Sequence, residues 1–490
     1  MQQFGEFRLS AWRQASALAA LLVLGVMTAL PAHAIPPFAR QTGMACNACH
    51  VVYPELTHFG RMFKINGYQL YNGKELQYTE DDGELRLGLP AVPNLALFIM
   101  SGYVSLGKAV PDSQVVGAHS TSSGIQFPQQ ISLLYGGKIA PHFGGFAQVT
   151  YDSTGDTFSI DNTDFRFAWQ FVLPDKKPLT LGVSITNNPT VDDAWNTTPA
   201  FGYPYLPPEI FVPSLTTPQI NAVQAYRVAG PVFYGLWNEQ LYVAAGFFRA
   251  AQVGQTNPIT GTIAPYDSTY SNVANGNNPY WRIAYEYDFD RYTAEIGTYG
   301  IYFKLFPGAG APLTGQTNNY TDIAEDVQLQ FLGETNQVTY QATYVKEAQA
   351  LHASYLAGAS NATDWVSYLQ TNLTYWYKRK YGADVGFLST KGSTDALLYP
   401  SAPTLCAAGT CNVAAGTPGA IPVGVTNSAN SNPTTDAVVS ELFYMPWLNV
   451  KIGLQYTHYT KFDGGKTNYD GVGRNASNND TTYLQLWFAL

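Results

Sequence analysis

The chain has 490 residues, of which only 12% are charged, against roughly 25% in typical soluble domains, and this composition argues against an ordinary soluble enzyme. Aromatic residues make up 14% of the chain, with 34 tyrosines among them. The formal net charge of −9 argues against nucleic acid as a partner, because phosphate backbones attract positively charged surfaces. Mean hydropathy is −0.10, so the many apolar side chains are interleaved with uncharged polar ones.

The N-terminal residues predict a secretory signal peptide. Arg8 and Arg13 form a positive region, residues 17–30 are apolar, and residues 32–34 have the A-x-A pattern of a cleavage site. The alternative is a retained membrane helix, but the apolar run is too short to span a bilayer comfortably. We therefore expect residues 1–34 to be removed when the protein is exported.

A c-type haem attachment motif follows. The sequence CNACH at residues 46–50 is C-x-x-C-H, in which two thioethers hold the haem vinyl groups and the histidine supplies the proximal iron ligand. The alternatives are a plain disulfide and a thioredoxin-like redox pair, which normally comes with a βαβ pattern that is absent here. In an exported chain the adjacent histidine favours haem. The sequence thus predicts one haem c, attached in the periplasm through Cys46 and Cys49, with His50 as proximal ligand.

The residues around the motif predict a small helical cytochrome c segment over 35–88. A helix is expected from Pro54, with Leu56, Phe59 and Phe63 on the face that packs on the porphyrin. A segment of this size rarely buries a cofactor unaided. We therefore expect it to form a plug in or at the lumen of a larger domain.

The distal iron ligand is left open by the sequence. In one straight helix His58 and Met62 would lie roughly 12 and 18 Å beyond the proximal histidine, so the chain must break, and Pro54 offers a break. Met62 is slightly favoured, although it could equally pack beside neighbouring phenylalanines. The alternatives are His58, Met44 and a side chain of the surrounding domain.

From residue 94 onward the dominant pattern has a period of two, which is typical of strands with two different faces. Sixteen strands are expected, near 94–106, 127–139, 144–153, 161–172, 179–187, 221–230, 240–250, 280–288, 292–304, 322–332, 337–348, 365–377, 381–390, 435–445, 449–460 and 481–490. Long connections alternate with short ones, such as 140–143, 289–291, 333–336, 378–380 and 446–448. Strands of about ten residues in even number, with short turns at one end, are typical of outer-membrane barrels.

The fold class predicted is therefore all-β: a 16-stranded, porin-like transmembrane barrel of the outer membrane over residues 89–490, with the cytochrome segment as its plug. The last residues alternate as in a strand that closes such a barrel and leaves no edge. The alternatives are a β-sandwich and a soluble barrel. Outer-membrane lipid is accordingly an expected partner.

Two further groups of residues are candidates. Cys406 and Cys411 flank a short segment rich in alanine and glycine, and in an exported protein they are expected to form a disulfide that closes a loop. Arg61 and Lys64 could pair with haem propionates or simply be solvated. Seven charged residues are expected to face the lumen: Asp152, Asp164, Arg166, Arg282, Glu286, Asp288 and Glu295. They could form an iron path or a network that positions the plug. The favoured interpretation is that they are the ordinary polar lining of a barrel lumen.

The sequence resembles the fused monohaem cytochrome–porins of the outer membrane in iron-oxidising bacteria. The resemblance rests on PFARQTG at 37–43, which leads into CNACH, and on PEL at 54–56 and FGRMFK at 59–64, which lead to Gly67-Tyr68. NPT at 188–190, WNTTP at 195–199 and GYPY at 202–205 are similar to a long loop of that family.

The resemblance implies an enzyme, an iron:cytochrome c oxidoreductase. Electrons would enter from extracellular Fe(II), pass to the haem and leave to a periplasmic carrier, either a cytochrome c or a cupredoxin. The resemblance implies the same roles for Cys46 and Cys49 as haem attachment sites and for His50 as proximal ligand. It identifies no residues of this sequence that would bind the substrate Fe(II). The alternatives are a haem-plugged porin or channel, and a conduit for another donor such as a reduced sulfur compound or a solid surface. The low charge content would suit a surface facing strong acid, although uncharged polar loops also occur in neutral settings.

Overall fold

The protein is described by a computed structural model. It describes residues 37–53, 55–70, 93–110, 121–152, 157–197, 212–221, 223–251, 272–307, 315–358, 361–400, 427–471 and 473–490. The expected signal peptide, the boundary at 88/89 and the expected Cys406–Cys411 disulfide lie outside these residues.

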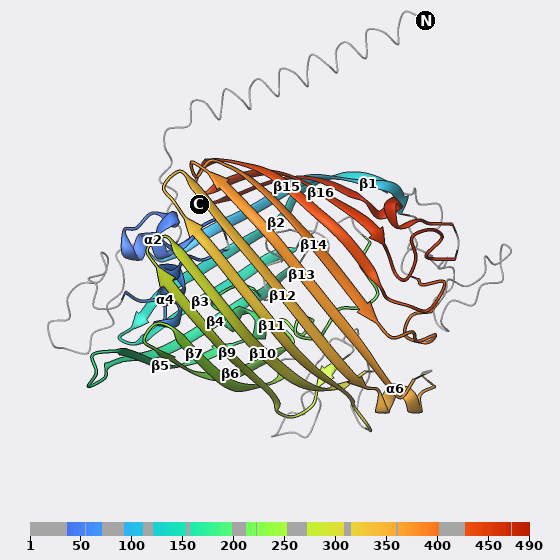
Figure 1. Ribbon diagram of the computed structural model, residues 1–490, viewed down its shortest axis with the longest axis horizontal. Helices are drawn as coiled ribbons and strands as arrows, with labels where there is room; N and C mark the ends of the chain where they lie inside the picture. Colours follow the sequence, from blue (N-terminus) through green and yellow to red (C-terminus); the bar gives the residue numbers. More distant parts are fainter. Residues whose placement is uncertain are drawn as a thin grey trace, which may run out of the picture. The chain divides into compact units, whose positions relative to one another are not determined.

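The described strands form one closed, antiparallel ring of sixteen (Figure 1). Each strand pairs with its neighbours in the chain, and the ring closes where β1 pairs with β17, from Phe98↔Ala489 to Leu106↔Thr481. Going round the ring, the strands are β1 (Leu95–Val110), β2 (Thr121–Ala140), β3 (Phe143–Asp152), β4 (Thr157–Val172), β5 (Pro178–Thr186), β6 (Val228–Trp237), β7 (Leu241–Ala250), β9 (Asn278–Phe289), β10 (Tyr292–Phe306), β11 (Asn318–Leu332), β12 (Asn336–Ala350), β13 (Thr363–Tyr377), β14 (Tyr381–Gly392), β15 (Thr435–Trp447), β16 (Val450–Lys461) and β17 (Thr481–Ala489). A two-residue strand, β8 (Val273–Ala274), adds to the edge of β10.

Fifteen of the sixteen predicted strands agree with this ring within a few residues. β6 is the exception, because residues 223–227 form turns and the strand runs from Val228 to Trp237. The prediction placed this strand near 221–230. Pro231 nevertheless lies within β6, opposite Ile185 of β5.

The two ends of the barrel differ. The connections 141–142, 173–177, 238–240, 290–291, 333–335, 378–380 and 448–449 are short and lie at one end, called here the turn end. Most connections at the other end, the loop end, are longer, and the one after β12 carries the short helix α6 (His352–Leu356). This asymmetry is the one predicted from the sequence, and in outer-membrane barrels the short turns face the periplasm.

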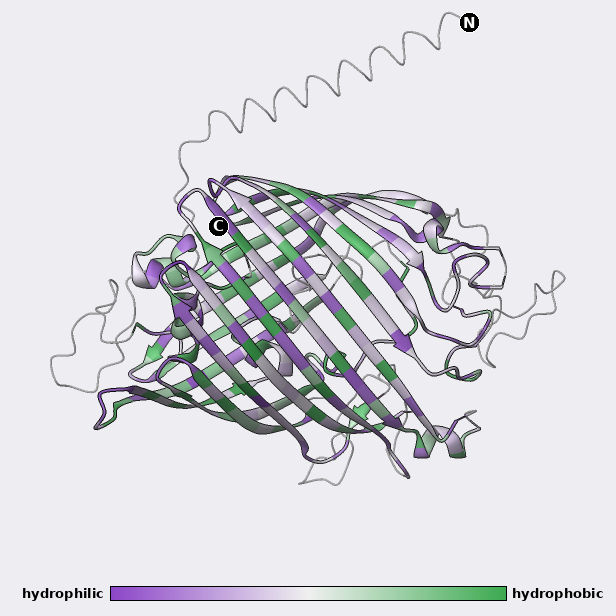
Figure 2. Cartoon of the chain, in the orientation of Figure 1, coloured by the Kyte–Doolittle hydropathy of each residue, from purple (hydrophilic) through white to green (hydrophobic). Residues whose placement is uncertain are grey.

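The strands are apolar outside and polar inside, and the alternation is visible along each strand in Figure 2. In β4, Asp164 and Arg166 are fully buried inside the barrel, whereas Trp169 and Phe171 are 44% and 48% exposed outside. In β17 Leu484 and Leu486 face outward. An apolar exterior around a polar interior is the pattern of a transmembrane β-barrel.

Short helices and loops fill part of the lumen. The N-terminal segment forms α2 (Pro37–Thr42), α3 (Cys46–Cys49) and α4 (His58–Ile65), which lie at the turn end (Figure 1). A second inner segment follows β5 and contains α5 (Pro189–Asp192). The loop before β17 contains a short 3-10 helix, Ala476–Asn479.

The described helices include none that is both long enough and apolar enough to cross a membrane.

Candidate functional site

The C-x-x-C-H motif forms a single helical turn, α3. The His50 amide closes the turn by donating to the Cys46 carbonyl at 2.9 Å. A tight reversal follows, in which the Val51 amide donates to the Glu55 carbonyl at 3.0 Å. This reversal explains why the helix expected from Pro54 begins only at His58.

The reversal lays α4 against α3. Thr57 caps the N-terminus of α4, because its hydroxyl accepts from the Gly60 amide at 3.2 Å and donates to the Ala48 carbonyl at 2.8 Å. Gly60 then lies directly against the end of α3, since a Cβ placed there would lie 2.2 Å from the Cys49 carbonyl oxygen. A glycine at this position is thus needed for the two helices to meet as they do.

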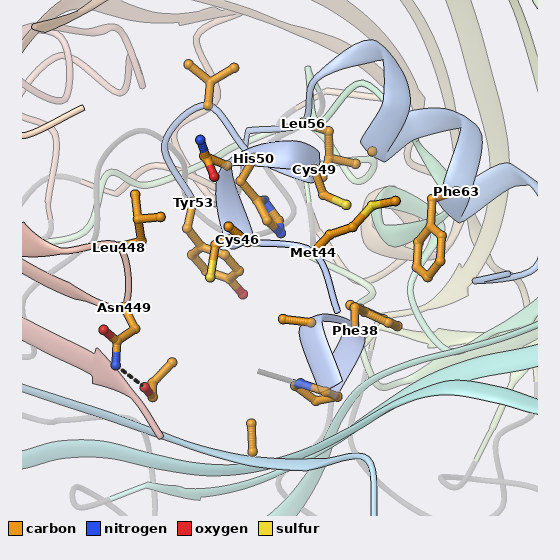
Figure 3. A pocket seen from close by; sticks show the side chains of 18 of the residues that line it. Phe38, Met44, Cys46, Cys49, His50, Tyr53, Leu56, Phe63, Leu448 and Asn449 are labelled. Atoms are coloured by element: carbon orange, nitrogen blue, oxygen red, sulfur yellow. Dashed lines mark hydrogen bonds between the residues drawn. The ribbon is translucent and has the colours of Figure 1, made fainter. Parts of the chain in front are cut away.

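Both motif cysteines and the histidine line one cavity at the turn end (Figure 3). The cavity lies between the N-terminal segment and the barrel wall, and its lining is mainly apolar. The N-terminal segment contributes Phe38, Met44, Cys46, Cys49, His50 and Phe63, and the wall contributes Phe98, Trp376, Met445 and Trp487. Of the three residues predicted to pack on a porphyrin, Leu56 and Phe63 line this cavity, whereas Phe59 points away and is partly exposed.

The donor set of this cavity fits a covalently attached haem. Two thiols and an imidazole within one turn face an apolar space, as two thioethers and a proximal ligand require. The described cysteines carry free thiols, and burial raises the pKa of Cys46 and raises that of Cys49 to about 11. Thiol–disulfide exchange uses cysteines of lowered pKa, so the redox-pair interpretation is disfavoured.

The three named candidates for the distal ligand lie in different places. Met62 is buried in an apolar cluster with Ile65 and Trp195, outside the cavity. The His58 Nδ1 lies 2.5 Å from a carboxylate oxygen of Glu286 and does not line the cavity either. Met44 does line the cavity and is 37% exposed.

A buried ion pair holds α4 against the barrel wall. Arg61 donates from Nε to one Glu286 oxygen and from an η nitrogen to the other, both at 2.8 Å. The Trp195 indole also donates to Glu286, and Arg61 donates to the Leu56 carbonyl. Arg61 therefore binds the wall and does not line the cavity, so it neither faces a propionate nor is solvated, the two alternatives that the sequence left open.

Lys64 ties α4 to the second inner segment. It lines the cavity, while its Nζ donates to the carbonyl oxygens of Val191 at 2.5 Å and Asp193 at 2.9 Å. Burial, and next the charge of Arg166, lower the pKa of Lys64 to about 8. The lysine is therefore a structural tie as well as a polar group at the edge of the cavity.

The end of the N-terminal segment is held in the same way. The Tyr68 hydroxyl donates to Asp164 at 2.7 Å, and Asp164 accepts from Arg166 at 2.7 Å. Arg166 also pairs with Asp192 of α5 at 3.2 Å. A parallel cluster surrounds Arg282, which lies 2.6, 3.2 and 3.4 Å from oxygens of Asp326, Glu295 and Asp193.

Most of the charges predicted to face the lumen therefore bind the inner segments, and the preference for ordinary lumen polarity was wrong for Asp164, Arg166, Arg282 and Glu286. Glu295 joins the Arg282 cluster, whereas Asp288 is exposed near the turn end. For Asp152 the structure describes only the backbone, in β3. Asp192 and Asp193, the partners of Arg166 and Arg282, were not predicted from the sequence. Two adjacent acids in a long loop, together with arginines expected to face the lumen, could have indicated this pairing.

Comparison with known proteins gives likeness in fold only. No family model and no curated protein matches the sequence. Among solved structures, Salmonella typhi OmpF in complex with daunomycin has a TM-score of 0.43 at 10% identity, covering 81% of this chain and 97% of that one. The outer membrane channel DcaP of Acinetobacter baumannii has a TM-score of 0.42 at 10% identity, covering 81% and 96%. The anion-selective porin from Comamonas acidovorans has the same TM-score and identity, covering 81% and 98%. At these TM-scores the likeness carries no argument about function.

Proposed function

We propose that this protein is an outer-membrane c-type cytochrome that oxidises extracellular Fe(II) and delivers the electrons to a periplasmic carrier, which makes it an oxidoreductase of the iron:cytochrome c type. One observation carries the proposal: both thiols and the imidazole of the C-x-x-C-H motif line one apolar cavity inside the end of a closed barrel. When bound, the haem supplies a one-electron carrier. The donor, Fe(II), rests on the family resemblance.

The architecture supports the proposed direction of electron flow. The cavity lies at the turn end, which faces the periplasm in outer-membrane barrels, while the long loops lie at the opposite end. A carrier at the turn end would then approach the cavity edge formed by Tyr53 and Met44, both partly exposed. The apolar exterior of the strands supports the outer-membrane location.

The chain's own residues fix and enclose the cofactor site. Cys46 and Cys49 would hold the haem edge and His50 would bind its iron, while Phe38, Phe63 and Trp487 exclude water from it. We propose Met44 as the distal ligand, because it alone of the three candidates from the N-terminal segment lines the same cavity. Lys64 also lines the cavity, but its Nζ donates to the carbonyl oxygens of Val191 and Asp193, so we do not assign it to a propionate.

The test is the visible spectrum of the purified, detergent-solubilised protein on adding Fe(II) at acid and at neutral pH. The proposal expects the reduced c-type α-band within the mixing time. A haem that stays oxidised with Fe(II) but reduces with dithionite would contradict the iron donor, and reduced sulfur compounds would be tried next. A purified protein without a covalent haem would leave the haem-free porin as the better interpretation.

A further inference from the structure

A second part of the chain enters the barrel from the loop end. Residues 212–221, called here the inner strap, follow the helix α5 segment and precede β6. Ile220 is buried in the same apolar cluster as Phe303 and Leu351 of the wall. At the other end of the strap, Val212 packs with Phe462 and Tyr469 of the loop before β17. The strap thus lies between the outer loops and the interior of the lumen.

Three carboxyl groups hold the backbone of the strap. The amides of Leu215, Gln219 and Ile220 donate to Asp463 at 3.1 Å, to Glu347 at 2.6 Å and to Asp322 at 2.7 Å, respectively. The three acids come from the loop after β16, from β12 and from β11. Each of them is buried, with at most 1% of its surface exposed.

These acids lack cationic partners. In the part of the chain that the structure describes, no lysine, arginine or histidine forms an ion pair with Asp322, Glu347 or Asp463. Asp322 and Glu347 are direct cross-strand partners, so two ionised carboxylates there would repel each other in a buried site. Tyr320 and Tyr399 interact electrostatically with Glu347, and Tyr459 and Tyr469 interact with Asp463. The other charged groups that act on these tyrosines are Asp364, Asp395, Asp470, Asp480 and Arg474.

Arg474 is the nearest cation in that set, but its nitrogens donate to the carbonyls of Lys108, Ala109 and Asn478 and to the Asn479 side chain. Burial raises the pKa of Tyr469, which packs against Val212, so this tyrosine stays neutral at acid and neutral pH. The carboxyl anchors are the titratable groups that bind the strap backbone directly.

We infer that the inner strap is a pH-sensitive closure of the loop end: it is bound when its three carboxyl anchors are protonated and is released when they lose their protons to solvent. This inference involves neither haem nor iron, so it can be tested independently of the proposed function.

The direction of the effect follows from proton linkage. Burial raises the pKa of Asp463 to about 7, so the bound strap holds protons that the released strap gives up. The bound state is then most stable below the ordinary aspartate pKa of about 4 and loses stability as the pH rises. Release is expected to be complete somewhat above pH 7.

Amide hydrogen exchange on the full-length, haem-loaded protein in detergent tests this inference. After correction for intrinsic exchange rates, protection of Leu215, Gln219 and Ile220 should fall at least tenfold between pH 4 and pH 8. The variant D322N/E347Q/D463N keeps an acceptor at each site but cannot ionise, so its protection should not change. Equal protection at both pH values in the wild type would overturn the inference, and so would an equal loss in the variant.

A second measurement does not depend on the folding of the triple variant. A single cysteine is introduced as I220C, whose backbone amide is retained, and is labelled with a membrane-impermeant maleimide from the loop side. The control is L356C on α6, because Leu356 is 72% exposed. The labelling rate of I220C relative to L356C should rise at least tenfold from pH 5 to pH 8, and a constant ratio would contradict the closure.

Discussion

At the scale of single residues, the two methionines that are candidates for the distal ligand lie in different places. Met44 lines the cavity of the C-x-x-C-H motif, whereas Met62 packs in an apolar cluster away from it. The sequence slightly favoured Met62, because sequence spacing does not show which way a side chain points after a chain reversal. Substituting each methionine in turn therefore tests which of them binds the iron.

We expect M44A to lower the haem midpoint potential and to remove the weak red absorption band of methionine-ligated ferric haem, because methionine ligation raises the potential. M62A is the matched control: it should lose packing stability, by about 2–5 kcal/mol for a buried methionine, and leave the potential unchanged. Redox titration with visible spectroscopy measures both. If M62A changed the midpoint potential and M44A did not, Met62 would be the distal ligand, as the sequence slightly favoured.

Gly60 offers a second prediction at the same scale. A Cβ at this position would lie 2.2 Å from the Cys49 carbonyl oxygen, so G60A must push α4 away from α3. We expect less haem per protein, measured by the pyridine haemochrome assay on the folded fraction. The control is G235A in β6, whose added Cβ would make ordinary contacts with a Leu181 methyl at 3.4 Å and the Thr180 carbonyl oxygen at 4.0 Å. Full haem content in G60A would show that α3 and α4 can separate without loss.

At the scale of elements, buried charges attach the helical segment to the barrel. Glu286 of β9 accepts from Arg61, lies beside His58 and also accepts from Trp195, so one carboxylate joins three parts of the chain. Removing one partner of a buried ion pair leaves the other charge uncompensated, at about 3–5 kcal/mol.

We therefore expect E286Q to loosen α4 and expose Trp195, with a loss of about 3–5 kcal/mol in the stability of the docked segment. Urea titration followed by tryptophan fluorescence and by protease cleavage of the segment measures this. E334Q is the matched control, because Glu334 is exposed and lies 3.9 Å from Arg291 in a turn. If both variants unfold at the same urea concentration, the ion pair does not hold the segment.

At the scale of the whole molecule, the barrel is filled from both ends. The N-terminal segment occupies the turn end, and the described residues 187–197 and 212–221 lie inside the barrel after entering from the loop end. Both inner segments therefore take up space inside the lumen.

Deleting residues 37–92 is expected to raise the single-channel conductance in planar bilayers above that of the full-length protein at the same pH, because the turn end of the lumen is then unfilled. The physical reason is that a sixteen-stranded barrel is wide enough to leave an aqueous channel. The control is the full-length protein with E334Q, whose substitution lies at an exposed turn and leaves the segment docked. An unchanged conductance after the deletion would show that the inner segment after β5 closes the barrel by itself.

The sequence by itself determined fifteen of the sixteen strands, the closure of the ring and the position of the C-x-x-C-H motif. A period of two is a local property, because the alternation of polar and apolar side chains can be read from one strand alone. In β4, for example, polar Asp164 is buried inside the barrel and apolar Trp169 is exposed outside, as the alternation predicts. The haem motif is local for the same reason, since its three functional residues lie within a single turn.

Only the tertiary structure decided which residues meet inside the barrel. The reversal that separates Met62 from the cavity, the junction at Glu286, and the pairing of Arg166 and Arg282 with Asp192 and Asp193 join residues that are far apart in the chain or turned by a loop. Loop conformation follows from the sum of many long-range contacts and leaves no period in the sequence. The helix start at His58 and the bounds of β6 were missed for this reason, because each follows a loop whose path depends on contacts inside the lumen.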